Sequence, residues 1–130
     1  MTQTGERPSG PDKAALSTET PQAQVAAKAG SGYSINVSTT DQGFAIQYTT
    51  PSGRDPNKEW DWIGVFERSD VPPWSELDNY KTWNWVCPNK ACGSQGTTVV
   101  DAVNWERGKT YTLVYFAWKW NIVATYTITP

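Results

Sequence analysis

Seven short runs of β-forming residues follow one another from Tyr33 to the end of the chain. Each run is rich in valine, isoleucine, threonine or aromatic residues, and turn residues such as Pro51-Ser52-Gly53 and Arg107-Gly108-Lys109 separate them. The predicted strands are residues 33–39, 43–50, 60–67, 79–86, 97–103, 110–118 and 121–128. This pattern is typical of an all-β, seven-stranded antiparallel sandwich of the immunoglobulin-like or fibronectin-like type.

The sixth run resembles the tyrosine corner of such sandwiches. It reads Tyr111-x-Leu113-x-Tyr115 and is entered from a tight Glu106–Lys109 turn. We therefore expect the Tyr111 hydroxyl to bond back to the backbone, with Leu113 and Tyr115 facing the core. By alternation, the outward positions are Thr112, Val114, Phe116 and Trp118.

Residues 1–30 differ from the rest of the chain. They contain no aromatic residue and are rich in Pro, Gly, Ser, Thr, Ala and Gln. Such a segment cannot bury enough apolar surface to offset its ordering entropy. We predict a disordered tail over residues 1–30 and one binding domain over residues 31–130, with the boundary at Gly30-Ser31-Gly32.

Six of the eight tryptophans form three W-x-W pairs. In an extended strand, residues i and i+2 project from the same face, so each pair places two indoles side by side. A sandwich of this size has one small core, and six such rings are hard to hide in it. We therefore expect an exposed aromatic platform. Soluble proteins rarely expose such a patch unless it binds a partner. The alternative is that these rings are core residues or cover sheet edges. The pairs are Trp60/Trp62, Trp83/Trp85 and Trp118/Trp120.

Composition excludes several classes of function. The formal net charge is −2 and the 11 Lys and Arg are scattered, which argues against nucleic-acid binding and against an anionic-membrane anchor. There is no histidine, so Ser-His-Asp catalysis and His-ligated metals are excluded. No cofactor or metal is expected. The apolar run Leu113–Trp118 is too short to span a membrane, and no signal peptide is visible, so we expect a cytoplasmic or non-classically secreted protein.

The two cysteines, Cys87 and Cys92, are close in sequence. A disulfide between them would close a small loop and stabilise the fold by roughly 2 kcal/mol. We expect such a staple in an oxidising compartment and two inert thiols otherwise. The spacing fits neither a four-ligand zinc site nor a C-x-x-C redox motif.

The third run reads DWIGVFE over Asp61–Glu67, and it resembles the D-W-I/V-G-L/I-F signature of SKICH domains. The segments Tyr80–Val86, Val99–Val103, Tyr111–Tyr115 and Ala124–Ile128 are similar to the later strands of that family in order and spacing. A similar strand occurs in the N-terminal β-sandwich domain of plant purple acid phosphatases. The resemblance implies a noncatalytic interaction and targeting module. The chain departs from the family pattern at its two cysteines and at residues 118–120.

Aromatic rings beside amide, carboxylate and ammonium groups suit a sugar, because a pyranose face stacks on indole while polar groups bind its hydroxyls. We expect the polar groups to be Asp61, Asn84, Lys119 and Asn121. The candidate ligand-binding residues are Trp60, Asp61, Trp62, Trp83, Asn84, Trp85, Phe116, Trp118, Lys119, Trp120 and Asn121.

Carbohydrate binding is therefore the first hypothesis, and the partner is a glycan or a protein. The alternative is a SKICH-like protein-interaction module or self-association as a homodimer, since interface hot spots favour Trp and Tyr. Membrane-surface binding through interfacial tryptophans ranks third. Glu59 and Asp61, about 6.6 Å apart along a strand, are close enough for paired-carboxylate glycoside hydrolysis. They flank tryptophans rather than line a visible cleft, so we expect no enzyme activity.

Overall fold

The computed structural model describes residues 32–41, 43–73, 76–77, 79–87, 91–100, 105–117 and 121–130. The tail predicted for residues 1–30 lies outside these ranges, and so do Trp118, Lys119 and Trp120. Within the described part of the chain, no helix has the length and hydropathy needed to cross a membrane.

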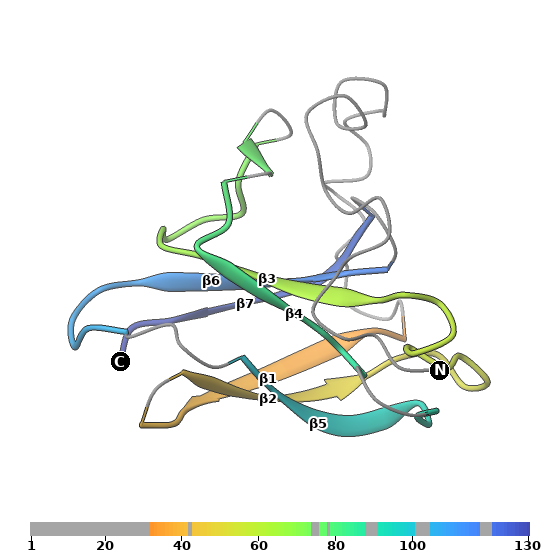
Figure 1. The fold of residues 1–130 in the computed structure, drawn as a ribbon. Coiled ribbons are helices and arrows are strands. Elements are labelled where there is room, and N and C mark those ends of the chain that lie inside the picture. Colours follow the sequence, from red (N-terminus) through yellow and green to blue (C-terminus); the bar gives the residue numbers. More distant parts are fainter. Residues whose placement is uncertain are drawn as a thin grey trace.

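Seven strands form two antiparallel sheets, and each strand overlaps one of the predicted runs. One sheet has the order β1-β2-β5 and the other the order β4-β3-β6-β7. Figure 1 shows the two sheets stacked as layers. The prediction of an all-β antiparallel sandwich is confirmed. The strands are β1 (Ser34–Thr39), β2 (Phe44–Thr49), β3 (Trp62–Phe66), β4 (Thr82–Trp85), β5 (Gln95–Val100), β6 (Tyr111–Phe116) and β7 (Ile122–Ile128).

The main core lies between the sheets and follows from strand alternation. In β1, Ile35 and Val37 are buried while the residues beside them are exposed. β2 repeats this pattern with Phe44, Ile46 and Tyr48 facing inward. Burying each such side chain contributes about 1.5–3 kcal/mol, so the alternating pattern fixes which face of each strand meets the other sheet.

The tyrosine corner predicted for β6 is present. The backbone N–H of Glu106 donates to the hydroxyl of Tyr111 over 2.9 Å. Leu113 and Tyr115 belong to the core between the sheets, as expected. Gly108, with a φ of 88°, turns the chain and donates its N–H to the carbonyl of Pro130 over 2.7 Å.

The other face of β6 is not exposed, so one expectation was wrong. Val114 and Phe116 do point away from the core between the sheets, yet both are 0% exposed and belong to a second buried cluster. The segment between β3 and β4 contributes Val71, Leu77 and Tyr80 to this cluster. Apolar residues therefore line both faces of the central strand, and a strict inside–outside alternation does not apply to it.

We expect Tyr111→Phe to lower the free energy of unfolding by about 1 kcal/mol, because the Glu106 N–H loses its acceptor. Urea unfolding followed by fluorescence measures this loss. The control is Tyr126→Phe, which removes a hydroxyl from a half-buried ring on the neighbouring strand β7. Equal stability of both variants and the parent protein would contradict a structural role for the corner.

Candidate recognition site

Seven rings form a continuous layer on the outer face of the four-stranded sheet. We call Trp60, Trp62, Phe66, Tyr80, Trp83, Trp85 and Phe116 the aromatic layer. Its base is a stacked pair, Trp62 on β3 and Phe116 on β6, whose ring centroids lie 4.1 Å apart at an interplanar angle of 12°. These two residues are paired across the strands, and Trp62 is paired on its other side with Trp85. The register of the sheet therefore builds the layer.

Gly64 lies directly beneath these rings. A Cβ added there would lie 3.2 Å from the rings of Trp62 and Phe66 and 3.4 Å from the ring of Phe116. The missing side chain leaves room for the rings to close over the middle of β3. Trp83 on β4 is the strand partner of Gly64 and lies edge-on to Trp62 at 6.5 Å.

The rings of the layer differ in their exposure. Trp62, Trp85 and Phe116 are only 1%, 2% and 0% exposed, so the expectation that they form an exposed platform was wrong. Neighbouring rings shield them: other rings pack edge-on against Trp62 and Trp85, and Phe116 stacks on Trp62. Trp60 and Trp83 are half-buried and lie at the rim of the layer. That rings of this layer contact a ligand stays a prediction.

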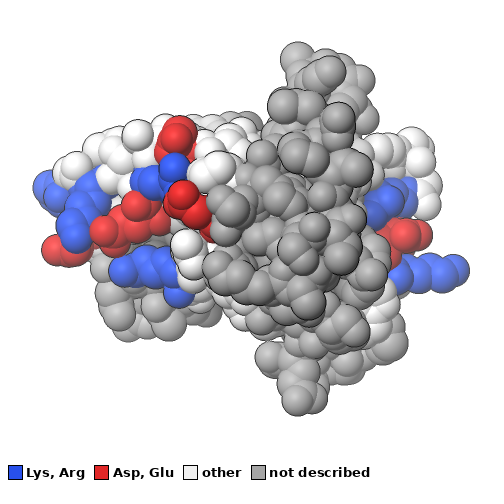
Figure 2. Space-filling view, turned by 90° about the horizontal axis from the view of Figure 1, so that it is seen from above, with Lys and Arg blue, Asp and Glu red and all other residues white. Residues whose placement is uncertain are grey.

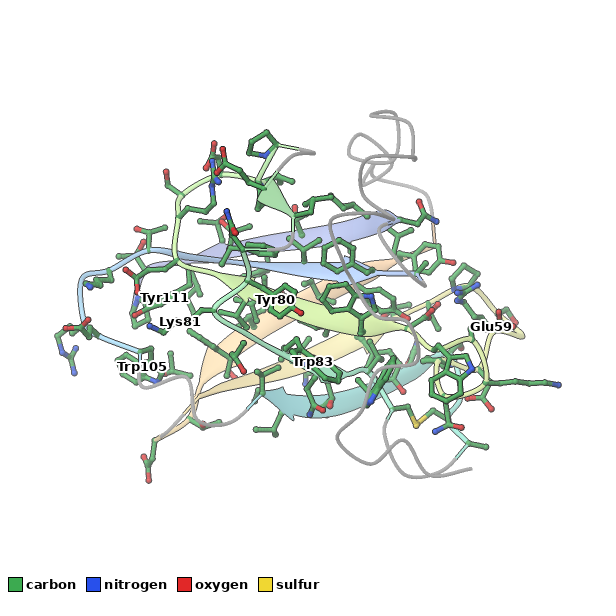
Figure 3. All side chains as sticks on the ribbon, turned by 45° about the horizontal axis from the view of Figure 1, so that its top comes forward. Glu59, Tyr80, Lys81, Trp83, Trp105 and Tyr111 are labelled. Atoms are coloured by element: carbon green, nitrogen blue, oxygen red, sulfur yellow. A yellow bond between two sulfur atoms is a disulfide. The ribbon has the colours of Figure 1, made fainter. Side chains whose placement is uncertain are left out.

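Trp85 is buried between the two half-buried rings, Trp60 and Trp83. Trp60 packs edge-on to it at 5.3 Å and Trp83 does so at 5.2 Å. Its indole N–H is buried, and among the described residues it has no hydrogen-bond partner. Figure 3 shows Trp83 projecting from β4 and Tyr80 from the segment that leads into it, while Glu59 lies at the other end of the sheet from Lys81.

Asp61 is a structural residue, which corrects its predicted role beside a sugar. It is 0% exposed, and its carboxylate accepts hydrogen bonds from Arg54 Nε (2.9 Å) and Nη2 (2.7 Å) and from the Tyr115 hydroxyl (2.6 Å). The bond to Asp61 raises the pKa of Arg54 above its ordinary value. Burial, followed by the charge of Asp61, raises the pKa of Tyr115. Removing one partner of such a buried pair typically costs about 3–5 kcal/mol.

Asn84 also has a structural role. Its side-chain amide donates to the carbonyl of Val99 over 2.8 Å, and its side-chain oxygen accepts from the N–H of Trp85 over 2.8 Å. The first bond links β4 of one sheet to β5 of the other. Of the four predicted polar residues, Asn121 is exposed after β6, and its carbonyl accepts from Ala117 N over 2.8 Å. Lys119 lies outside the described residues.

The turn before β3 sets the position of Trp60. This turn is held by bonds to two linked residues, Cys87 and Cys92, which we call the disulfide hairpin. Cys87 and Cys92 are joined by a disulfide with their Cα atoms 6.3 Å apart. The Asn57 side chain donates to the carbonyl of Cys87 over 2.8 Å, and the N–H of Cys92 donates to Asp55 Oδ1 over 3.0 Å. Trp60 itself has a φ of 60°, a conformation that non-glycine residues seldom adopt, so surrounding contacts must stabilise it.

Asp55 and Asn57 are supporting residues that were not predicted from the sequence. The local signal was Asp55-Pro56-Asn57, a set of residues that favours a turn with side-chain bonds to the backbone. Asp55 Oδ1 does accept from Asn57 N over 2.9 Å. The bonds to the disulfide hairpin could not be inferred, because they join segments 30 and 37 residues apart.

Charged residues lie outside the strands throughout the described chain. Figure 2 shows basic and acidic side chains mixed at the two ends of the molecule in that view. Several of them are paired: Glu67 accepts from Lys81 and Lys109, each over 3.4 Å, and Arg68 contacts Asp70. The described residues contain no group of three or more His, Cys, Asp or Glu side chains arranged to hold a metal ion.

The fold and this surface define a β-sandwich domain with a half-buried aromatic rim. The sequence model of the SKICH domain matches residues 34–128 of the chain. The match covers most of the chain and all seven strands, so the chain belongs to the SKICH domain family. Domains of this family are noncatalytic interaction modules. A search among curated proteins found no match to the chain.

We expect the double variant Cys87→Ser/Cys92→Ser to loosen the turn that holds Trp60, because the hairpin no longer fixes the groups that bond Asp55 and Asn57. The free energy of unfolding should fall by roughly 2 kcal/mol. Acrylamide quenching, measured with and without Trp60→Phe, reports the accessibility of Trp60, which should rise in the double variant. Unchanged quenching of Trp60 would show that the hairpin does not position this ring.

The Asp55 carboxyl should titrate below its usual range. Its pKa is lowered chiefly because the Cys92 N–H donates to it, with further bonds from the backbone of Asn57 and Lys58. The folded state therefore favours the ionised form, and this contact adds stability above the ordinary pKa of about 4. The stability is lost as pH falls through the lower folded pKa.

An NMR titration of the side-chain carboxyl measures this pKa directly. Asp55→Asn should also flatten the acid limb of the stability–pH curve, whereas Asp41→Asn, at the exposed turn after β1, serves as the control. An ordinary pKa for Asp55 would contradict the contact with Cys92 in solution.

Proposed function

We propose that this domain binds a protein partner through the rim of the aromatic layer, with Trp83 and Trp60 as the main contacts. The observation that supports this is the contrast within the layer: these two rings are half-buried, while Trp62, Trp85 and Phe116 beneath and between them are buried. Rings held in this way lose little conformational freedom on binding. Tryptophans in such packed surroundings are frequent hot spots of protein interfaces.

The surroundings of the rim also suit a protein better than a sugar. A sugar site built on an aromatic surface needs polar groups beside the ring to bind hydroxyls, but Asp61 and Asn84 make hydrogen bonds within the domain. Glu59 and Lys81 are exposed and belong to the turn before β3 and the approach to β4. Protein interfaces typically have aromatic residues at their centre and charged or polar residues around them. Carbohydrate or membrane-surface binding by the aromatic layer stays a prediction.

Catalysis is not part of the proposal. The one pair of carboxylates considered for hydrolysis, Glu59 and Asp61, includes a side chain that is buried in an ion pair with Arg54. For localisation, the disulfide favours an oxidising compartment over the cytoplasm, because cytoplasmic thiols are kept reduced.

The test compares the parent protein with Trp83→Ala, Trp60→Ala and the control Trp105→Ala. Trp105 is also half-buried, but its indole N–H donates to the Thr40 carbonyl over 2.8 Å and it lies outside the aromatic layer. A partner is first identified by cross-linking and then measured as a pure protein by calorimetry. Loss of either rim tryptophan should weaken its affinity by about 1–3 kcal/mol, the usual effect of removing an aromatic hot spot.

Two results would overturn the proposal. In one, every specific partner binds Trp83→Ala and Trp60→Ala as tightly as the parent while both variants stay folded. In the other, a neutral sugar shifts the tryptophan emission and the shift disappears in Trp83→Ala, which identifies the rim as a sugar site instead.

A further inference from the structure

The second sheet presents an outer face of a different kind from the aromatic layer. β1, β2 and β5 form the lower layer in Figure 1. Their register places the outward residues in three rows across the sheet. The central row is Asn36, Gln47 and Thr97. The flanking rows are Ser34, Thr49 and Gln95 on one side and Ser38, Ala45 and Val99 on the other. Seven of these nine side chains are amides or hydroxyls, and none is charged.

Three hollows adjoin one another on this face. Their volumes are about 400, 320 and 380 Å³, within the range of small-ligand sites. Thr97 lines all three, and Gln47 and Gln95 each line two. The hollows therefore form one continuous polar track that runs from β1, across β2 and β5, to the disulfide hairpin at Cys92.

The chemistry of the track excludes several partners. A nucleic acid, an anionic lipid or an acidic polymer needs cationic side chains, and the three strands have none. A hydrophobic peptide or lipid needs apolar area, whereas Val99 is the one large hydrophobic residue among the described ones that is classed as exposed. Amide and hydroxyl groups both donate and accept hydrogen bonds, which matches a ligand whose own groups do the same.

The size of the face argues against a stable contact with a second copy of the chain. Three strands of six residues cover roughly 15 Å by 20 Å, far less than the ~800 Å² that each partner buries in a standard interface. The track crosses all three strands, and a short chain molecule can contact its central residues Gln47, Thr97 and Gln95 together. The strands of this face are already ordered by their pairing in the sheet, so binding a ligand there costs little conformational entropy.

We propose that this face is a binding site for a neutral oligosaccharide, with Gln47, Thr97 and Gln95 as the central hydrogen-bonding groups. The site is separate from the protein-binding rim and does not depend on it. Because neither the ligand nor the face is charged, binding is insensitive to salt.

Affinity electrophoresis in gels that contain dextran, laminarin, mannan or xylan tests this proposal, with heparin as the anionic comparison. We expect at least one neutral polysaccharide to retard the protein at both low and high salt, and heparin not to do so. Gln47→Ala and Thr97→Val should each weaken the retarding interaction about tenfold, the effect of losing one hydrogen bond. Trp83→Ala is the matched control on the other sheet and should bind like the parent.

Three outcomes would overturn the proposal. The first is that none of the neutral polysaccharides retards the protein. The second is that retardation is lost in Trp83→Ala and kept in Gln47→Ala and Thr97→Val, which places the sugar on the aromatic layer. The third is a dimer, seen by sedimentation and abolished by Thr97→Arg, which would make the face a contact between copies.

Discussion

The buried carboxylate of Asp61 is the contact on which the candidate site most depends. Its carboxylate binds Arg54, seven residues earlier in the same connection, and Tyr115 on β6, 54 residues further along the chain, so one charged group ties the connection before β3 to the central strand. Such a charge is tolerated in the interior only because each oxygen receives a hydrogen bond and the arginine supplies the opposite charge. Trp60 and Trp62 directly flank Asp61, and the position of their backbone therefore follows from this ion pair.

The same turn is also held from its other side by the disulfide hairpin. Asn57 and Asp55 bond the backbone of the two cysteines, and Cys87 lies two residues after Trp85. Trp60 and Trp85 are thus brought together by two independent constraints, and their rings meet edge-on at 5.3 Å. This arrangement explains how a tryptophan with a φ of 60° persists at the rim.

The two sheets offer two chemically different surfaces. The four-stranded sheet has aromatic rings on its outer side, whereas the three-stranded sheet has amides and hydroxyls. The strands on both sides are free of charge, and the charged residues lie in the connections, where many pair with one another. Long-range electrostatic steering is therefore a poor basis for recognition by either sheet, and shape, stacking and hydrogen bonds are better ones.

The sequence alone determined the seven strands and the tyrosine corner, because alternation and turn residues act over a few neighbouring positions. The DWIGVF strand likewise indicated the SKICH family. Only the tertiary structure decided which tryptophans remain accessible. Trp62, Trp85 and Phe116 are buried by contacts across three strands and by the segment before β4. The role of Asp61 was misjudged for the same reason: its partners Arg54 and Tyr115 are set by the packing of the fold and not by local sequence.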